Sequence, residues 1–428
     1  MNASPVPPPA NAARAWSWIP TLYFSQGIPY VVVMTLSVVM YKNLKLSNTD
    51  IALYTSWLYL PWVIKPLWSP VVDLFRTKRF WIVSLQLAIG AAFALVALTI
   101  PAPHFFQLTL AMFWLLAFSS ATHDIAADGF YMLALPAHQQ AAFVGVRSTF
   151  FRLAMIAGQG GLVYLAGYLQ DYTGDVARAW TLVFGLLAGL AVVAGLYHAL
   201  VLPQPPTDHA VRQRGRLMAD FVAVFGAFFR KPGLGVMLGF LLLYRFAESQ
   251  LLKLVTPFLL DGRDVGGLAL STQQVGLAYG TIGVLALTGG GLLGGYVISC
   301  YGLKRLLWPM IFAMNVPNLI FVALAWWQPS AVAVIGAALA VEQFGYGFGF
   351  AAYLLTMIMF AEGEHKTAHY AICTGFMALG MMLPGMAAGW IQEQLGYQNF
   401  FLWVMACTIP SFAACAFVKI DPAFGKKA

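Results

Sequence analysis

Long apolar stretches separated by short polar ones run through almost the whole chain. A helix needs about 20 apolar residues to cross the hydrocarbon core of a bilayer. Stretches of about this length recur, and their spacing predicts twelve transmembrane helices, with both chain ends on one side of the membrane. They cover residues 17–41, 50–72, 80–100, 106–132, 141–169, 179–201, 235–260, 271–298, 304–326, 331–358, 369–391 and 398–419.

The composition excludes the alternative of several soluble domains. Hydrophobic residues make up 60% of the 428 residues, charged residues make up only 9%, and the mean hydropathy is +0.75. A soluble domain carries about 25% charged residues, because its surface faces water. The fold class that we predict is therefore an all-α membrane protein.

The basic residues indicate how the chain is oriented. The net charge of +8 does not point to nucleic acid, because Lys and Arg are spread over alternate loops and do not gather on one face. The termini and the loops after even-numbered spans hold 15 of the 24 Lys and Arg residues, and the other loops hold four. The positive-inside rule then places both termini in the cytoplasm. The fifteen are Arg14, Arg76, Lys78, Arg79, Arg212, Arg214, Arg216, Arg230, Lys231, Lys304, Arg305, Lys366, Lys419, Lys426 and Lys427; the four are Lys42, Lys45, Arg178 and Arg263.

A polar, Arg-rich segment, residues 203–231, lies near the middle of the chain. It lacks an apolar period and separates six spans from six, so we expect a linker on the cytoplasmic membrane surface between two homologous halves. The predicted organisation is a disordered cytoplasmic tail (1–16), an N-terminal six-helix bundle (17–202), the cytoplasmic linker (203–234), a C-terminal six-helix bundle (235–419) and a cytoplasmic tail (420–428).

The loops after the second and eighth spans support an internal repeat. The first reads Ser69-Pro-Val-Val-Asp73-Leu-Phe-Arg76-Thr-Lys78-Arg79, and the second reads Gly295-Tyr-Val-Ile-Ser299-Cys-Tyr-Gly302-Leu-Lys304-Arg305. Both resemble, in degenerate form, the G-x-x-x-D-(R/K)-x-G-(R/K)-(R/K) loop of the major facilitator superfamily. The resemblance implies that superfamily's fold and a cytoplasmic gate, whereas the alternative is that the basic residues only orient the loops. The gating-loop candidates are Asp73, Arg76, Lys78, Arg79, Lys304 and Arg305.

Charged residues also fall inside the predicted spans. A charge at the bilayer centre costs about 2.5–3.5 kcal/mol on insertion scales, so each must face a cavity or a partner. Nine charged residues within the predicted spans indicate a polar pathway across the membrane. They are Lys65, Arg147, Arg152, Arg245, Lys253, Asp124, Asp128, Glu248 and Glu342.

The densest cluster lies in the fourth span. Asp124 and Asp128 are four residues apart, which stacks them on one face of a helix, where two close carboxylates can take up and release a proton. Counting residues from the cytoplasmic end puts Arg147 at the depth of Asp128 and Arg152 at the depth of Asp124. We therefore predict the ion pairs Asp128–Arg147 and Asp124–Arg152 as a proton-coupling site. A static ladder of salt bridges that only fixes the two helices is the alternative.

Other polar and aromatic residues of the spans form a candidate substrate site. Gly27 with Pro29, and the glycines of residues 345–349, are expected to interrupt the first and tenth spans at a central cavity lined by spans one, four, seven and ten. Arg245 and Glu248 are three residues apart and are expected to pair. The substrate-binding candidates are Gln26, Tyr30, Tyr59, Trp62, Lys65, Arg245, Glu248, Lys253, Glu342 and Gln343.

No metal, cofactor or enzyme chemistry is predicted. His123 stands beside Asp124, but adjacent residues point about 100° apart on a helix, so it faces away from the two carboxylates. No nucleophile–base pair and no phosphate-binding loop is recognisable.

Several segments resemble the AmpG-type muropeptide permeases, a major facilitator subfamily that also includes acetyl-CoA transporters. The most specific is the run from His123 to Phe130, which matches that subfamily's D-I-x-x-D segment and is followed by Leu135 and Pro136. Where the subfamily has an acidic-arginine segment, this chain has His138-Gln139-Gln140, and it lacks the extra C-terminal spans of some members. The further matching segments are Trp68-Ser69-Pro70-Val-Val-Asp73, Tyr244-Arg245-Phe-Ala-Glu248 and Glu342-Gln343-Phe-Gly.

The resemblance implies a proton-driven importer of muropeptides in the bacterial inner membrane. We expect a monomer that acts on a small-molecule substrate and protons and binds no nucleic acid. The resemblance assigns the coupling role to Asp124 and Asp128. Two alternatives stay open: a carrier for another bulky polar metabolite, such as an oligosaccharide or acetyl-CoA, and a transporter-like muropeptide sensor.

Overall fold

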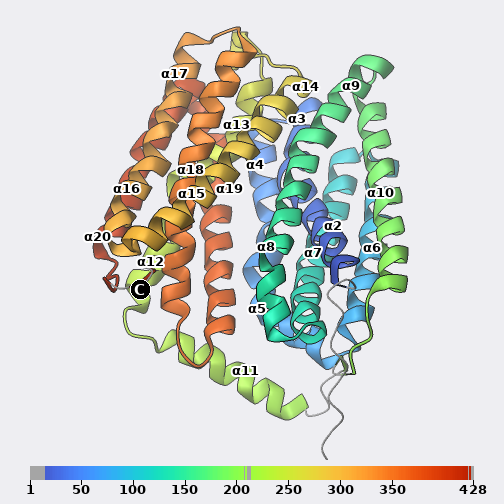
Figure 1. The fold of residues 1–428 in the computed structure, drawn as a ribbon. Helices are drawn as coiled ribbons and strands as arrows, with labels where there is room; N and C mark the ends of the chain where they lie inside the picture. Colours follow the sequence, from blue (N-terminus) through green and yellow to red (C-terminus); the bar gives the residue numbers. More distant parts are fainter. Residues whose placement is uncertain (1–14, 207, 210–213, 423, 426–428) are drawn as a thin grey trace, which may run out of the picture.

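The computed structural model describes residues 15–206, 208–209, 214–422 and 424–425, and within them it contains helices and no strand (Figure 1). The side chains at positions 73, 137–138, 141–142, 144, 214–218 and 220 lie outside this description. So do most of the predicted N-terminal tail and, among the candidate residues, the side chain of Asp73.

The first six predicted spans are helical, and three of them contain an irregular turn. The first consists of α2 (Ile19–Val31), a wide π-helical turn at Val32–Leu36 and α3 (Ser37–Asn43). The second is divided by a turn at Leu58 and Tyr59 into α4 (Asn48–Trp57) and α5 (Leu60–Leu74). Then come α6 (Lys78–Thr99), α7 (Phe105–Ala134), the fifth span of α8 (Ala137–Ile156), a π-helical turn at Ala157–Leu162 and α9 (Val163–Thr173), and finally α10 (Val176–Val201).

The second half repeats this arrangement. The seventh span consists of α12 (Leu234–Leu243) and α13 (Phe246–Leu260). The eighth consists of α14 (Thr272–Val275), a π-helical turn at Gly276–Gly283 and α15 (Val284–Tyr301). The ninth consists of α16 (Leu303–Asn315) and α17 (Leu319–Trp327), and the tenth is α18 (Val332–Ala361). Helix α19 (Lys366–Ala406) contains Gly396 at φ 70°, where one span ends and the next begins, and α20 (Thr408–Phe417) completes the chain.

The structure agrees with twelve crossings. Ten helical stretches among the described residues are long and apolar enough to cross a membrane. One of them, Lys366–Phe417, is 52 residues long and holds two crossings because of the kink at Gly396. Helices α4 and α5 together form a further crossing that is not among the ten stretches. This crossing and the second crossing of the 52-residue stretch bring the total to twelve.

The two halves stand side by side, with α11 (Arg214–Phe229) beneath them (Figure 1). We call the end of the molecule that carries α11 and the described residues nearest both termini the linker end, and the other the opposite end. Between the halves, α4 and α5 pack on α19, and the π-helical turn of the fifth span packs on that of the eighth. A Cβ atom at Gly280 would lie 1.9 Å from the Gln159 carbonyl oxygen, so the backbones of the two halves touch there.

The prediction of a linker without apolar period was wrong for residues 214–229, which form α11. The end of this helix packs on the C-terminal half: the Phe228 side chain is fully buried, and the His369 ring nitrogen lies 3.3 Å from the Val224 carbonyl oxygen. Lys231 follows, and its ammonium donates to the carbonyl oxygens of Phe360 at 2.5 Å and Glu362 at 2.8 Å. These are unpaired carbonyls at the end of α18, and partial burial lowers the pKa of Lys231 below its usual value.

The expected interruption of the tenth span was also wrong. Helix α18 runs through residues 345–349, and its glycines instead allow neighbouring helices to approach closely. A Cβ atom would lie 2.2 Å from the Ala313 carbonyl oxygen if built on Gly345, and 2.0 Å from that of Leu287 if built on Gly347. In the first span Pro29 widens the helix into the π-helical turn that follows it, but the helix is not broken there. Small residues at helix contacts are typical of membrane bundles, where no hydrophobic force holds helices together.

We predict that Gly290→Ala in α15 destabilises the protein, because its Cβ would lie 2.1 Å from the Phe344 carbonyl oxygen of α18. Overpacking of this kind costs about 1–3 kcal/mol. Gly295→Ala in the same helix is the matched control: nothing lies within 4 Å of its Cβ, and Ala is about 1 kcal/mol better than Gly inside a helix. Thermal unfolding in detergent should show a lower Tm for the first variant only. Equal Tm values would mean that the α15–α18 contact is looser than described.

Candidate functional site

Polar side chains join the two halves at the opposite end. The Lys42 ammonium lies 2.6 Å from an Asp261 carboxylate oxygen, and the other oxygen of Asp261 accepts a 2.6 Å hydrogen bond from the Tyr397 hydroxyl. The Asn48 amide donates to Gln392 at 2.7 Å and to the Tyr397 oxygen at 2.9 Å. We call this group of five residues the opposite-end lock.

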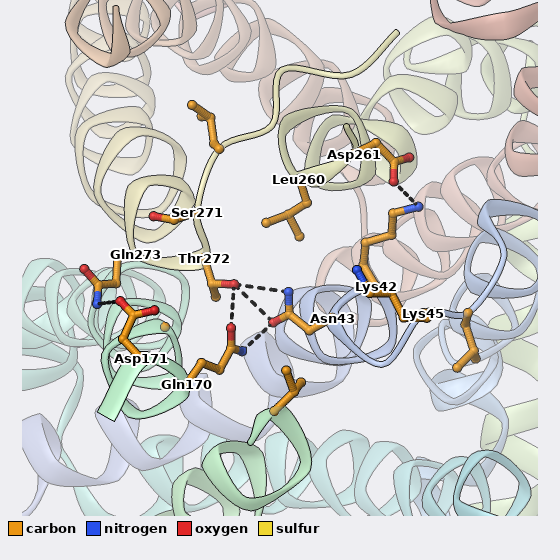
Figure 2. A pocket seen from close by; sticks show the side chains of 14 residues that line it. Lys42, Asn43, Lys45, Gln170, Asp171, Leu260, Asp261, Ser271, Thr272 and Gln273 are labelled. Carbon is orange, nitrogen blue, oxygen red and sulfur yellow. Dashed lines mark hydrogen bonds and ion pairs between the residues drawn. The ribbon is translucent and has the colours of Figure 1, made fainter. Parts of the chain in front are cut away.

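A second set of inter-half contacts lies beside the lock (Figure 2). Asn43 and Gln170 of the N-terminal half both hydrogen-bond the Thr272 hydroxyl, at 3.1 and 3.2 Å, and the Gln273 amide donates to Asp171 at 2.9 Å. These residues and the Lys42–Asp261 pair line a pocket of about 350 Å³ between the halves. The hydrogen bonds that we observe between the halves cluster at this end of the molecule. Sequence reasoning missed these residues, because it treats Lys42 only as a loop charge and assigns no role to the amide side chains near it.

Inside the N-terminal half, Asp124 pairs with Lys65 and not with Arg152 as predicted. One Asp124 carboxylate oxygen lies 3.5 Å from the Lys65 ammonium and accepts a 3.1 Å hydrogen bond from the Trp62 ring N–H. The other oxygen is buried without a hydrogen-bond partner. The predicted pair was wrong because depth along a helix does not fix the direction in which a side chain points. Arg152 leaves the bundle toward the other half: a Cβ atom built on Gly291 of α15 would lie 3.7 Å from its guanidinium.

The predicted contact between Asp128 and Arg147 is present. The Arg147 guanidinium donates to a carboxylate oxygen of Asp128 at 2.8 Å, and the Tyr23 hydroxyl donates to the same oxygen at 3.4 Å. The guanidinium also stacks over the rings of Tyr23 and Tyr131, 4.5 and 5.0 Å from their centroids. Both partners of the ion pair are partly exposed, so this pair is easier to open than one sealed in the bundle.

In the C-terminal half, Arg245 does not form the expected ion pair with Glu248. Arg245 precedes α13 with non-helical backbone angles, so the regular spacing of a helical turn does not apply between them. Its guanidinium instead hydrogen-bonds the Tyr346 hydroxyl and lies over the Phe350 ring, 4.9 Å from the centroid. Its Nε atom is buried and finds no partner.

Two further carboxyl groups are buried in this half. Both oxygens of Glu248 lack a hydrogen-bond partner, and Glu342 has one free oxygen and one that accepts from Gln343 at 2.9 Å. Exposed fractions are 1% for Glu248 and 0% for Glu342. Buried polar groups are normally paired, so these oxygens mark places where a proton, water or substrate group completes the site.

The aromatic candidates connect the halves. The Lys253 ammonium donates to the Thr55 hydroxyl at 3.0 Å and stands 5.1 Å from the Tyr59 ring centroid. The Tyr30 and Trp62 rings meet edge to face with centroids 5.3 Å apart. Gln26 is buried with its carbonyl oxygen unpaired. The arrangement offers ring faces and hydrogen-bonding groups to a ligand between the halves.

The basic loop residues lie at the linker end. The backbone N–H groups of Lys78 and Arg79 bind the Asp208 carboxylate at 2.7 and 3.1 Å, and Arg79 donates to the Ala199 carbonyl oxygen near the end of α10. These contacts cap helices and attach the linker to the N-terminal half. Arg76 stacks over the Phe80 ring and Arg305 over the Tyr301 ring, and Lys304 is exposed.

No group of three His, Cys, Asp or Glu side chains in the described part of the chain is placed to hold a metal ion. His123 is fully buried, and neither ring nitrogen has a hydrogen-bond partner.

Comparison with known proteins finds relatives along most of the chain. A sequence profile of the Major Facilitator Superfamily matches residues 21–383. The anhydromuropeptide permease of Escherichia coli strain K12 is 25% identical over 354 residues, which are 82% of this chain and 68% of the permease. Among solved structures, a mutant of the nucleoside transporter NupG aligns with a TM-score of 0.70 and 15% identity, over 94% of this chain and 99% of that one. A D-xylose–proton symporter aligns with a TM-score of 0.69 and 15% identity, over 97% and 99%.

We predict that Lys65→Met destabilises the protein, because the Asp124 carboxylate keeps only the Trp62 N–H as a partner. Removing one partner of a buried ion pair costs about 3–5 kcal/mol, and the partial exposure of Lys65 places this case near the lower end. Thermal unfolding in detergent measures the loss. The double variant Lys65→Met/Asp124→Asn should recover most of it, since no charge is then left alone. A double variant as unstable as the single one would show that Lys65 acts through packing.

Proposed function

The chain belongs to the major facilitator superfamily and is a multi-pass membrane transporter, and from this premise we propose that it imports muropeptides into the bacterial cytoplasm with the proton gradient. The observation that carries the proposal is the pair of stacked carboxylates, Asp124 and Asp128. Each faces its own cation, Lys65 or Arg147, inside a membrane-spanning bundle.

The geometry suits a proton site. A carboxylate held by a cation loses that attraction when it takes up a proton, and the cation is then free to move. Asp128 is the more exposed of the two and exchanges protons first, whereas Asp124 lies deeper and has one oxygen without a partner. Protonation of both frees Lys65 and Arg147, which loosens the contacts of α7 with α5 and α8.

The substrate class is supported by the surfaces between the halves and by one relative. The aromatic rings of Tyr30, Tyr59 and Trp62 suit contact with the apolar faces of sugar rings. The buried carboxyl, amide and amine groups near them suit hydrogen bonds with the hydroxyl and amide groups of a muropeptide. The related E. coli protein is named an anhydromuropeptide permease. Other bulky polar metabolites, such as an oligosaccharide or acetyl-CoA, are the alternative cargo, and a sensor that binds without transport is the alternative role.

The distribution of basic residues favours a cytoplasmic linker end, with both termini inside. On that orientation the opposite-end lock faces the periplasm and closes the path from outside. The described conformation is then an inward-facing one, in which the partly exposed Asp128 and Arg147 lie toward the cytoplasm.

We expect Asp124→Asn and Asp128→Asn to abolish accumulation of muropeptide against a gradient while substrate exchange persists. Asn has the volume of the protonated acid but cannot release a proton, and the aromatic and C-terminal groups that bind substrate are unchanged. The measurement is uptake and counterflow of radiolabelled anhydromuropeptide in proteoliposomes, together with proton movement into the lumen.

Glu364→Gln, which removes an exposed carboxylate at the linker end, is the matched control and should transport normally. If both Asn variants still move protons with substrate, the carboxylates are structural and coupling lies elsewhere. Saturable uptake of an oligosaccharide or acetyl-CoA, but not of muropeptide, would support the alternative cargo. Binding of muropeptide by the wild type without counterflow would support the sensor.

The orientation has its own test. In a Cys300→Ser background, a cysteine introduced by Arg214→Cys should resist a membrane-impermeant maleimide applied to intact spheroplasts and should react after lysis. Arg178→Cys is the control at the opposite end, where Arg178 is exposed, and it should react before lysis. The reverse pattern would invert the proposed topology.

A further inference from the structure

Arg152 is a cation in the membrane-spanning part of α8, and no residue that the structure describes pairs with it. Within the described residues it forms no ion pair or hydrogen bond, because its expected partner Asp124 is occupied by Lys65 and Trp62. The side chain is partly exposed and extends from α8 to the backbone of α15, where its guanidinium lies 3.7 Å from the Cβ position of Gly291. It therefore reaches across the boundary between the halves.

Arg245 approaches the same place from the C-terminal half. Its guanidinium hydrogen-bonds the Tyr346 hydroxyl, and Arg152 is also within electrostatic range of that residue. Arg245 is only 8% exposed, yet its Nε atom has no partner and no described carboxylate pairs with it. Arg245 thus contacts the phenol, and Arg152 of the other half lies beside the same stretch of α18, since the Gly347 carbonyl oxygen and its guanidinium lie 3.6 and 3.7 Å from the Cβ position of Gly291.

No carboxylate among the described residues forms an ion pair or hydrogen bond with either guanidinium. The phenol and the rings of Tyr346 and Phe350 offer a hydrogen bond and π faces but no negative charge. Glu248 follows Arg245 by three residues and lies within electrostatic range of it, but its oxygens form no hydrogen bond with it. Two guanidinium groups that no carboxylate contacts are costly inside a membrane protein, so an anion from outside the chain would complete the site.

We propose that Arg152 and Arg245 together bind one anionic group, a carboxylate or phosphate, of the transported molecule. The proposal rests on the proposed transport function and narrows its substrate class to anions. Guanidinium groups donate paired N–H bonds that match either oxyanion. Because one arginine comes from each half, the bound anion bridges the halves and favours conformations in which both reach it. Tyr346 is a positioning residue, since it orients Arg245.

The test is binding to the purified, detergent-solubilised protein, followed by tryptophan fluorescence. N-acetylmuramic acid supplies a carboxylate, N-acetylglucosamine 6-phosphate supplies a phosphate, and N-acetylglucosamine is the neutral probe. We expect Arg152→Gln and Arg245→Gln each to weaken binding of an anionic probe about 10–100-fold, as for loss of a charged hydrogen bond, and to change the affinity for the neutral sugar less than about twofold. The double variant should lose less than the product of the two single effects, because both arginines hold one group.

Arg178→Gln, at an exposed position of the opposite end, is the matched control and should bind all probes as the wild type does. Arg152→Lys and Arg245→Lys keep the charge and should retain part of the anion preference, which separates recognition from folding. A preference for the carboxylate over the phosphate identifies the group that the site takes.

The outcomes separate this inference from the proposed function. If the wild type binds N-acetylmuramic acid and the arginine variants bind it equally well, the inference is overturned while muropeptide transport stands. If the wild type binds only the phosphate probe and the variants lose that affinity, the arginine site stands and muropeptide as cargo fails. A wild type that prefers no anionic probe to the neutral sugar contradicts the inference.

Discussion

A charged side chain inside a bilayer must meet an opposite charge, a polar neighbour or water, and this requirement organises the interior of the protein. Asp124 and Asp128 are each held by a cation from another helix, and so these pairs fix how α7 sits against α5 and α8. The C-terminal half differs: the Arg245 guanidinium lies over aromatic rings, and the buried carboxyl groups of Glu248 and Glu342 form no ion pair among the described residues. The two carboxylates of the N-terminal half are thus compensated within that half, whereas Arg152 and the polar groups of the C-terminal half depend more on what enters between the halves.

The features that the sequence predicts well are those that depend on hydropathy and on distance along a helix. The twelve crossings, the division into halves and the contact of Asp128 with Arg147 follow from such patterns. The partner of Asp124 could not be found in this way, because rotation about the helix axis and the path of α5 decide that Lys65 reaches it first. The role of the glycines in α18 could not be predicted for a similar reason. A glycine that breaks a helix and a glycine that lets a neighbouring helix approach look alike in a sequence.

Two kinds of contact join the halves, and they differ in how easily they separate. Where the fifth and eighth spans meet, the backbones touch through glycines, and the contact leaves no room for a Cβ atom. At the opposite end the contact is a set of amides and hydroxyls around one ion pair, beside a pocket. Hydrogen bonds of this sort contribute little net free energy each, because water replaces them when they open. Rocking of two rigid halves requires one contact that persists and another that opens. The glycine contact suits the first role, and the polar contacts at the opposite end suit the second.

Helix α11 also acts as a strap of limited length. Before α11, the Asp208 carboxylate binds the first turn of α6 in the N-terminal half, and the end of α11 is held to the C-terminal half through Val224 and Phe228. With about 3.5 Å per extended residue and 1.5 Å per helical residue, the chain between Asp208 and Val224 reaches roughly 35 Å at most. The separation of these two anchors therefore has an upper bound as long as both attachments hold. Wider opening at this end would require one attachment to be released, and so the linker limits how far the two halves can separate there.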